Sequence, residues 1–286
     1  MNFILKSNPD YLRRNNLGND YSDWLAPDEN TPNLLIDTAY WALVAREMAE
    51  MAHALHRDAD AKKYQQQYEH IAVAYRAQFV KADGSVAGNS QTAYLATLYT
   101  GIAIPALEAG MVDRLVKEIH AHDDHLTTGF LGTPFLLSVL DQYNHPDLAF
   151  KLLLSDTYPS WGYMVEKGAT TWWERWNGDT GDPGMNSYNH YAFGSVMAWV
   201  YRRAAGIDTD PAGPGFHHLV VQPHFDASLP QLNVEYDSLY GTIISDWQAS
   251  THQFTITLPA NVTATVILPN RRPESVGSGR HTYTIQ

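Results

Sequence analysis

Residues 188–215 read YNHYAFGSVMAWVYRRAAGIDTDPAGPG, and they divide the chain into a helical part and a strand-rich part. Apolar side chains recur at helical spacing from Tyr188 to Ala204, and Gly206 stands where a glycine commonly ends a helix. Asp208–Gly215 is rich in Asp, Pro and Gly, which is typical of a linker. The stretch therefore predicts that one domain ends and another begins near Gly206.

The part of the chain before Gly206 alternates helical stretches with connections. Small and apolar residues recur on one side of the first long stretch, where Pro32 suits a first helical turn. The predicted helices span Thr31–Leu55, Ala59–Val80, Gln91–Tyr99, Met111–His120, Thr133–Asp141, Pro146–Leu153 and Tyr188–Ala204. Short connections alternate with long ones that carry Gly, Asp, Thr and Trp. This layout predicts a ring of helical hairpins whose loops at one mouth carry the chemistry.

The part after Gly206 contains short runs rich in Val, Ile and Thr, separated by Pro, Asn, Ser and Gly. These runs predict strands at Leu219–Gln222, Leu232–Tyr236, Gly241–Gln248, Gln253–Leu258 and Thr263–Leu268. Such a series favours an antiparallel β-sandwich. The sequence therefore predicts two domains, a helical one at residues 1–206 and a β-sandwich at residues 207–286.

Composition limits the classes of partner. The chain has 286 residues, of which 44% are hydrophobic, and this predicts globular domains with buried cores. A net charge of −12 argues against nucleic acid or an anionic membrane as a partner. No apolar run is long enough to span a bilayer, and the absence of cysteine excludes disulfides and thiolate metal sites. We expect a cytoplasmic protein that binds no metal. The sequence is also compatible with a periplasmic location.

Residues 168–179, GATTWWERWNGD, carry the most informative group of side chains. Glu174 lies among Trp172, Trp173 and Trp176 in a connection between helices. Apolar walls raise the pKa of a carboxyl group, whereas an adjacent arginine or sugar hydroxyls lower it. A glycosidase that inverts configuration needs a carboxylate of this kind to activate water. The same residues also fit a surface Glu–Arg pair beside core tryptophans, so the local chemistry leaves both interpretations open.

Three further segments suit a sugar site, although each has an ordinary structural interpretation. His190 is expected in the first turn of a helix, where it could bond a sugar hydroxyl or pack in a polar network. Asp23 and Trp24 join a carboxylate to an indole in a loop before the first long helix. The stretch at residues 127–134, TTGFLGTP, could line a mouth or form a tight turn. Eight Trp and seventeen Tyr residues also suit sugar binding, because aromatic rings pack against the apolar face of a pyranose.

Together the four segments resemble the bacterial α-L-rhamnosidases of glycoside hydrolase family 78, in the order that is typical of the family. The resemblance covers essentially the whole chain, and the Gly-Ala-Thr-Thr-x-Trp-Glu-x-Trp block is its most specific part. It implies an (α/α)6 barrel followed by a β-sandwich, an inverting reaction and no cofactor. By this resemblance Glu174 is the general base, His190 contacts rhamnose and Trp24 is a site tryptophan. We add Asp23, Trp173 and Trp176 as candidate substrate contacts.

One departure concerns the general acid. The family's Asp-x-Pro-x-x-Glu-Arg type of segment does not occur in this sequence, and Ser22 stands where the family usually has glycine. We therefore expect a partial barrel that lacks its N-terminal half, has little activity alone and associates with itself through the open barrel edge. The expected substrate is a glycoside or oligosaccharide with terminal α-L-rhamnose. The alternatives are a non-catalytic carbohydrate-binding fragment and a helical-barrel glycosidase or phosphorylase of other sugar specificity.

Overall fold

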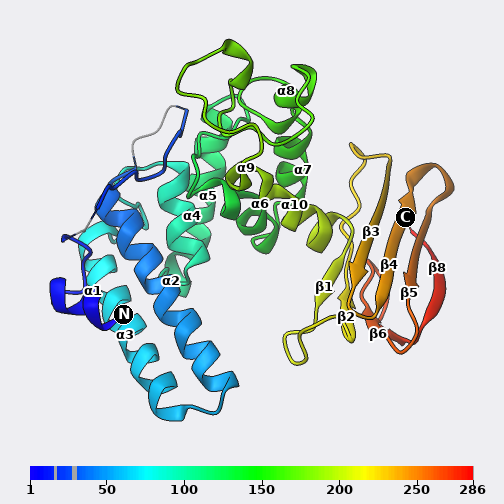
Figure 1. Cartoon of the computed structure of the whole chain (residues 1–286), viewed down its shortest axis with the longest axis horizontal. Coiled ribbons are helices and arrows are strands. Elements are labelled where there is room, and N and C mark those ends of the chain that lie inside the picture. The colour runs from blue at the N-terminus through cyan, green and yellow to red at the C-terminus, as the bar shows by residue number, and fades with distance from the viewer. Residues whose placement is uncertain (16–17, 28–30, 286) are drawn as a thin grey trace. The chain divides into compact units, whose positions relative to one another are not determined.

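The computed structural model describes residues 1–15, 18–27 and 31–285. The chain forms two compact units, one mainly helical and the other mainly β (Figure 1). The helical unit consists of Met1–His145 with Leu152–Gly194. The β unit consists of Ser195–Gln286 together with Pro146–Lys151. The domain boundary that we predicted between residues 206 and 207 stays a prediction.

The helical unit is built on a long hairpin of helices, α2 and α3, which lie side by side along their length (Figure 1). Its helices are α1 (Asn2–Ser7), α2 (Asn33–Ala54), α3 (Asp58–Phe79), α4 (Gln91–Tyr99), α5 (Pro105–Ala121), α6 (Thr133–Gln142), α8 (Trp161–Glu166) and α9 (Tyr191–Gly194). The helix α7 (Pro146–Leu154) belongs partly to each unit. Every residue of α4 from Gln91 to Leu98 is buried, so this helix forms the centre of the core.

Local capping explains several helix starts. The Ser90 hydroxyl accepts a hydrogen bond from Ala93 N at α4, and the Ser160 hydroxyl accepts one from Tyr163 N at α8. Proline occupies the first turn of α5, α6 and α7, where its missing N–H costs nothing. The predicted start of α5 at Met111 was late, because Pro105 begins that helix.

The single helix that we predicted at Tyr188–Ala204 is wrong. The chain instead forms α9, then α10 (Val196–Trp199), then a π-helix at Val200–Ala204. Tyr188–His190 belongs to the loop before α9, where the Ser187 hydroxyl and His190 Nδ1 accept hydrogen bonds from the backbone N–H groups of Asn189 and Ala192. Gly206, with φ of 72°, ends the helical stretch in the left-handed conformation, as expected for a glycine cap.

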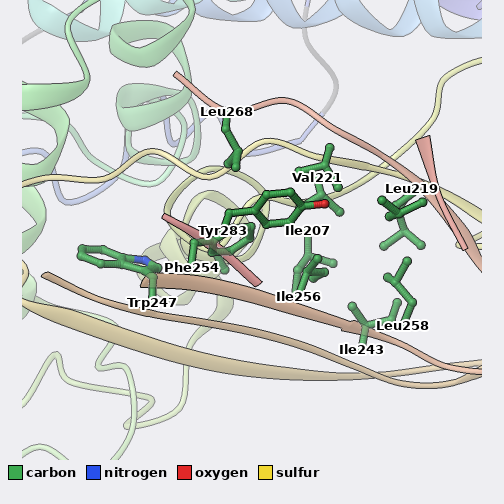
Figure 2. Close-up of a cluster of buried hydrophobic side chains, with 14 of the residues drawn as sticks. Ile207, Leu219, Val221, Ile243, Trp247, Phe254, Ile256, Leu258, Leu268 and Tyr283 are labelled. Atoms are coloured by element: carbon green, nitrogen blue, oxygen red, sulfur yellow. The ribbon is translucent and has the colours of Figure 1, made fainter. Parts of the chain in front are cut away.

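The β unit contains two four-stranded sheets, with strand orders β1-β2-β6-β7 and β3-β4-β5-β8. Its strands are β1 (Ile207–Thr209), β2 (His218–Val221), β3 (Gln231–Ser238), β4 (Gly241–Gln248), β5 (Gln253–Leu258), β6 (Thr263–Val266), β7 (Glu274–Val276) and β8 (Gly279–Thr284). Side chains from both sheets share one core, which includes Leu219 and Val221 from the first sheet and Trp247 and Phe254 from the second (Figure 2). A β-sandwich of this kind was predicted.

Two details of the predicted sandwich need correction. The strands β2 and β6 are parallel, whereas all other pairs are antiparallel. The stretch Asp208–Gly215 is not a linker between domains, because Ile207–Thr209 pairs with Leu219–Val221 as an antiparallel hairpin. Residues 211–215 are the exposed connection of that hairpin. Among the residues that the structure describes, no helix is long and apolar enough to cross a membrane.

Candidate active site

The loop that carries Asp23 and Trp24 is fixed to a second loop, residues 128–132, by a dense set of hydrogen bonds. Asp23 Oδ1 accepts from Leu131 N at 2.7 Å and from Gly132 N at 2.9 Å. Asp23 Oδ2 accepts from Gly129 N at 2.8 Å and from the Thr92 hydroxyl at 2.5 Å. Each oxygen thus already accepts two hydrogen bonds, so Asp23 holds the two loops together rather than offering an acceptor to a ligand.

The surroundings of Asp23 act on its ionisation in two directions. The side chain is buried, and burial raises the pKa of the Asp23 carboxyl, while the four donated hydrogen bonds favour its charged form. The neighbouring Trp24 is bound through its backbone, because Phe130 N donates to Trp24 O at 2.9 Å. Ser22 has φ of 52°, in the left-handed region that glycine adopts most easily. This conformation fits the glycine that the family resemblance implies at this position.

Trp24 lies beside a surface hollow of about 290 Å³. Its indole is 41% exposed and meets the ring of Tyr21 edge-on, with the ring centroids 5.5 Å apart. Phe130 and Tyr191 also line this hollow, and the Tyr191 side chain is 78% exposed. Tyr21 and Tyr191 were not among the candidate sugar contacts that we predicted from the sequence. The signal for them was their position near Trp24 and beside His190 in the sequence.

His190 connects this aromatic group to the segment that carries Glu174. The His190 ring lies against Phe130 and Tyr191, with centroid distances of 4.5 Å and 5.1 Å. His190 Nδ1 accepts a hydrogen bond from Ala192 N, so the proton of a neutral ring is on Nε2. His190 N in turn donates to Trp172 O at 2.7 Å. The ring is therefore held in place, with Nε2–H as its remaining donor.

Glu174 is buried and is not paired with the adjacent arginine. Glu174 Oε2 accepts a hydrogen bond from Asn186 N at 3.2 Å, and Glu174 N donates to Ser187 O at 3.0 Å. Arg175 points elsewhere, toward Asp182 Oδ2 at 3.3 Å and Gly184 O at 3.2 Å. The alternative of a surface Glu–Arg pair is therefore wrong. Only 7% of Glu174 is exposed, which is the environment of a residue with restricted access to water.

The three tryptophans that are close to Glu174 in the sequence differ in their surroundings. Trp176 is 2% exposed, since its ring stacks on Phe193 at 3.8 Å and meets Trp161 edge-on at 5.4 Å. Trp173 is 7% exposed and packs against Gly178. Burial leaves both rings little surface for a ligand, and their roles as sugar contacts stay predictions. Trp172 retains more exposed surface, and it lines a hollow of about 250 Å³ with Thr170 and Thr171.

The structure thus joins Trp24 to His190 through Phe130, and joins His190 to the Glu174 segment through backbone hydrogen bonds. That Glu174 and Trp24 line one concave surface stays a prediction. In the part of the chain that the structure describes, no group of three or more His, Cys, Asp or Glu side chains could hold a metal ion. One buried carboxylate, one held imidazole and several exposed aromatic rings suit acid–base chemistry on an uncharged sugar.

Comparison with known proteins identifies the family. The family model for the bacterial alpha-L-rhamnosidase 6 hairpin glycosidase domain matches residues 1–204, and the model for the bacterial alpha-L-rhamnosidase C-terminal domain matches residues 206–282. An alpha-L-rhamnosidase of Streptomyces avermitilis is 39% identical over 93% of this chain, and one of Formosa agariphila is 34% identical over 93%. The matches cover 28% and 30% of those proteins, so the chain spans less than a third of their length.

Solved structures give the same result. The crystal structure of the Streptomyces avermitilis alpha-L-rhamnosidase complexed with L-rhamnose matches 100% of this chain and 30% of that chain, with a TM-score of 0.88 and 37% identity. The alpha-L-rhamnosidase from Dictyoglumus thermophilum matches 98% of this chain and 35% of that chain, with a TM-score of 0.86 and 29% identity. The chain therefore belongs to the bacterial α-L-rhamnosidase family of six-hairpin glycosidases.

Proposed function

We propose that this chain supplies the general-base half of an active site that hydrolyses terminal α-L-rhamnosides with inversion of configuration. The observation that carries the proposal is the state of Glu174. This carboxylate is buried, is oriented by Asn186 N and forms no ion pair within the described residues. A carboxylate that is oriented by a hydrogen bond and is not paired with a cation is suited to take a proton from water.

The proposed chemistry divides two proton transfers between two carboxyl groups. Glu174 removes a proton from the water that attacks the anomeric carbon. A carboxylic acid on the opposite side of the sugar protonates the oxygen of the leaving group, so the bond to the aglycone breaks while the bond to water forms. The segment that supplies this acid in the family is not present in these 286 residues. We therefore propose that this chain needs the acid of another segment for turnover.

The aromatic residues around Trp24 fit the recognition of a 6-deoxy sugar. Trp24, Phe130 and Tyr191 offer ring faces for the apolar side of the pyranose and for its methyl group. His190 Nε2–H is a donor for one sugar hydroxyl, and its ring is kept in place by Phe130 and Ala192 N. One rigid donor beside apolar walls is the common design of a small-ligand site.

A chimera tests the role of Glu174. In it, this chain replaces the matching part of the Streptomyces avermitilis relative. In the active chimera, Glu174→Gln should lower kcat on an aryl α-L-rhamnoside by about 100- to 10,000-fold, because the amide cannot take a proton from water. Circular dichroism should show an unchanged fold. Proton NMR of the first-formed sugar should show the β anomer, as inversion requires.

The matched control is Glu166→Gln, at an exposed glutamate in the last turn of α8. It should leave kcat unchanged. A Glu174→Gln chimera that keeps more than about a tenth of the rate would show that another group is the base. A first product in the α configuration would contradict inversion.

Non-catalytic carbohydrate binding is a second candidate function for the polypeptide alone. The exposed rings of Tyr21, Trp24 and Tyr191 around one hollow favour it, because they can hold a sugar without any acid. Titration of the chain with L-rhamnose, with and without Trp24→Ala, tests this binding. Both candidates expect no turnover by the polypeptide alone, so the chimera separates them. Binding by the polypeptide together with an inactive chimera would support the second candidate.

A further inference from the structure

The β unit contains a hollow that lies outside the site described above. Its volume is about 390 Å³, within the range of about 300–1,000 Å³ for small-molecule sites. The hollow lies where β1, an edge strand of one sheet, and β3, an edge strand of the other, are closest to the π-helix. Ile207, which is buried in the sandwich core, also lines it.

Three aromatic rings form the walls of this hollow. Phe216 and Tyr236 are tilted by 41° with their centroids 4.6 Å apart, and Tyr201 meets Tyr236 edge-on at 6.1 Å. All three are only partly buried at the margin of the sandwich core. The Tyr201 hydroxyl donates to Glu235 O at 3.3 Å, which fixes the π-helix to the edge of β3. The rings therefore form a rigid apolar recess, and part of each ring remains exposed to a ligand.

Two unusual backbone features place these rings. Tyr201 and Arg202 belong to the π-helix Val200–Ala204, and π-helical turns are rare and frequently occur at functional sites. Phe216 has φ of 64°, a left-handed conformation that is strained for an aromatic residue. Strain of this kind gathers at binding and catalytic sites, where the surrounding structure holds it. Two of the three wall residues, Tyr201 and Phe216, thus lie on unusual backbone conformations.

Polar groups stand beside the aromatic walls. Asp208 Oδ1 accepts from Thr209 N at 2.9 Å and lies 3.8 Å from Arg202 Nε. Asp208 Oδ2, the Thr209 hydroxyl and the Tyr236 hydroxyl make no hydrogen bond within the described residues. The Arg202 side chain is 65% exposed. Donors and acceptors next to ring faces are what a ligand with both an apolar face and hydroxyl groups requires.

We propose that this hollow is a second saccharide-binding site, separate from Glu174 and from the Trp24 hollow. One sugar ring lies against Tyr236 and Phe216, and its hydroxyls bond Asp208, Arg202 and Thr209. The choice of a saccharide as ligand rests on the proposed function, whereas the hollow itself does not. A second site of this kind would let the chain bind a saccharide in addition to the one at the first site.

The test uses the whole chain with Trp24→Ala, which disables the first hollow, and methyl α-L-rhamnoside as the probe. Saturation-transfer NMR and titration should still detect binding to this variant. Adding Tyr236→Ala should weaken that binding at least about tenfold, as expected when a central aromatic contact is removed. Asp208→Asn, which keeps the acceptor for Thr209 N, should also weaken it and is less disruptive to the fold.

Tyr240→Ala is the matched control, since Tyr240 is an exposed tyrosine of the same unit whose ring lies by His217. It should leave binding unchanged. If Trp24→Ala alone abolishes all binding, the second site is refuted while the proposed function stands. If binding survives Trp24→Ala but neither Tyr236→Ala nor Asp208→Asn affects it, the second site is refuted as well. Binding that depends only on Tyr236 would support the second site and contradict sugar binding at Trp24.

Discussion

A carboxylate followed by an indole, as in Asp23 and Trp24, suggests two ligand contacts. In the folded chain the two side chains differ, because one is buried and hydrogen-bonded and the other is exposed. The Asp23 carboxylate accepts four hydrogen bonds from Thr92 and the loop at residues 128–132. The Trp24 side chain is exposed beside the hollow. Residue type predicted that both would matter. It could not show which one faces inward, because that depends on donors 69 to 109 residues away in the chain.

Glu174 illustrates the same limit. Its sequence neighbours, Arg175 and three tryptophans, allowed both a buried base and a surface ion pair. The structure separates the two, because Arg175 turns to Asp182 and Gly184 while Glu174 turns to Asn186 N. Both choices depend on the conformation of the loop at residues 177–187, which local pattern does not specify.

Gly129 makes the fixed pair of loops testable at the level of one residue. A Cβ at this position would lie within 3.0 Å of Asp23 O and Trp24 O and 2.7 Å from Ala26 N, all of them backbone atoms. Gly129→Ala should therefore lower the free energy of unfolding by about 1–3 kcal/mol, as overpacking does, and weaken sugar binding at Trp24. Chemical denaturation and titration with L-rhamnose measure the two effects.

The control for this prediction has the opposite sign. Gly110 lies inside α5, where an added Cβ would meet no atom within 4 Å. Gly110→Ala should raise the free energy of unfolding by up to about 1 kcal/mol, because alanine favours the helix. If Gly129→Ala raised the free energy of unfolding as Gly110→Ala does, the loops around Gly129 would have to accept the added Cβ without strain.

At the scale of elements, the sequence predicted most helices and strands in place, and the misses have physical causes. Periodicity found α2, α3, α4 and α6 within two residues of each end, because these helices bury continuous apolar faces. It failed at Tyr188–Ala204, where apolar spacing continues across Gly194 but the backbone breaks into two short helices and a π-helix. The strands β1, β7 and β8 were missed because they are short or follow turn-like sequence. The partner of β8 is β5, which is not its neighbour in chain order, so a local pattern does not indicate that pair.

The helix α2 exposes apolar side chains as well as burying them. Val44, Met51 and Leu55 are 43%, 52% and 69% exposed, and their spacing places them on one side of the helix with the partly exposed Met48. We propose that copies of the chain associate through this stripe, because exposed apolar stripes favour contact. Val44→Lys with Met51→Lys should shift the chain toward a monomer in chromatography with light scattering.

The control is Val73→Lys on α3, which changes an exposed valine that lies outside this stripe. It should leave the molar mass unchanged. A wild-type chain that is monomeric at high micromolar concentration would refute association through α2. A change with Val73→Lys alone would place the contact elsewhere.

At the scale of the whole molecule, the chain combines a barrel segment with a β unit, and the Streptomyces avermitilis and Formosa agariphila relatives are more than three times as long as the matched part. The family resemblance predicted both fold types from four short segments. It could not predict the parallel β2–β6 pair or that the helical residues 196–204 belong to the β unit, which depend on packing between segments far apart in sequence.

The catalytic consequence belongs to this scale, because the proposed mechanism needs two carboxyl groups and we assign only one of them, Glu174, to this chain. The 286-residue polypeptide alone should bind L-rhamnose but show no measurable hydrolysis of an aryl α-L-rhamnoside, whereas the chimera should turn over. Loss of acid catalysis costs about 100- to 10,000-fold, which is enough to bring the rate below detection. The measurement is a chromogenic assay of the two proteins at equal concentration.

Activity of the polypeptide alone would mean that it contains its own acid. Asp23 is a poor candidate, because both of its oxygens are occupied by protein donors. Asp179 is a better candidate, since it is exposed and, within the described residues, its carboxylate accepts only from the Tyr163 hydroxyl, at 3.1 Å. Any such activity should therefore disappear with Asp179→Asn as well as with Glu174→Gln. Activity that survives Asp179→Asn would mean that another residue is the acid.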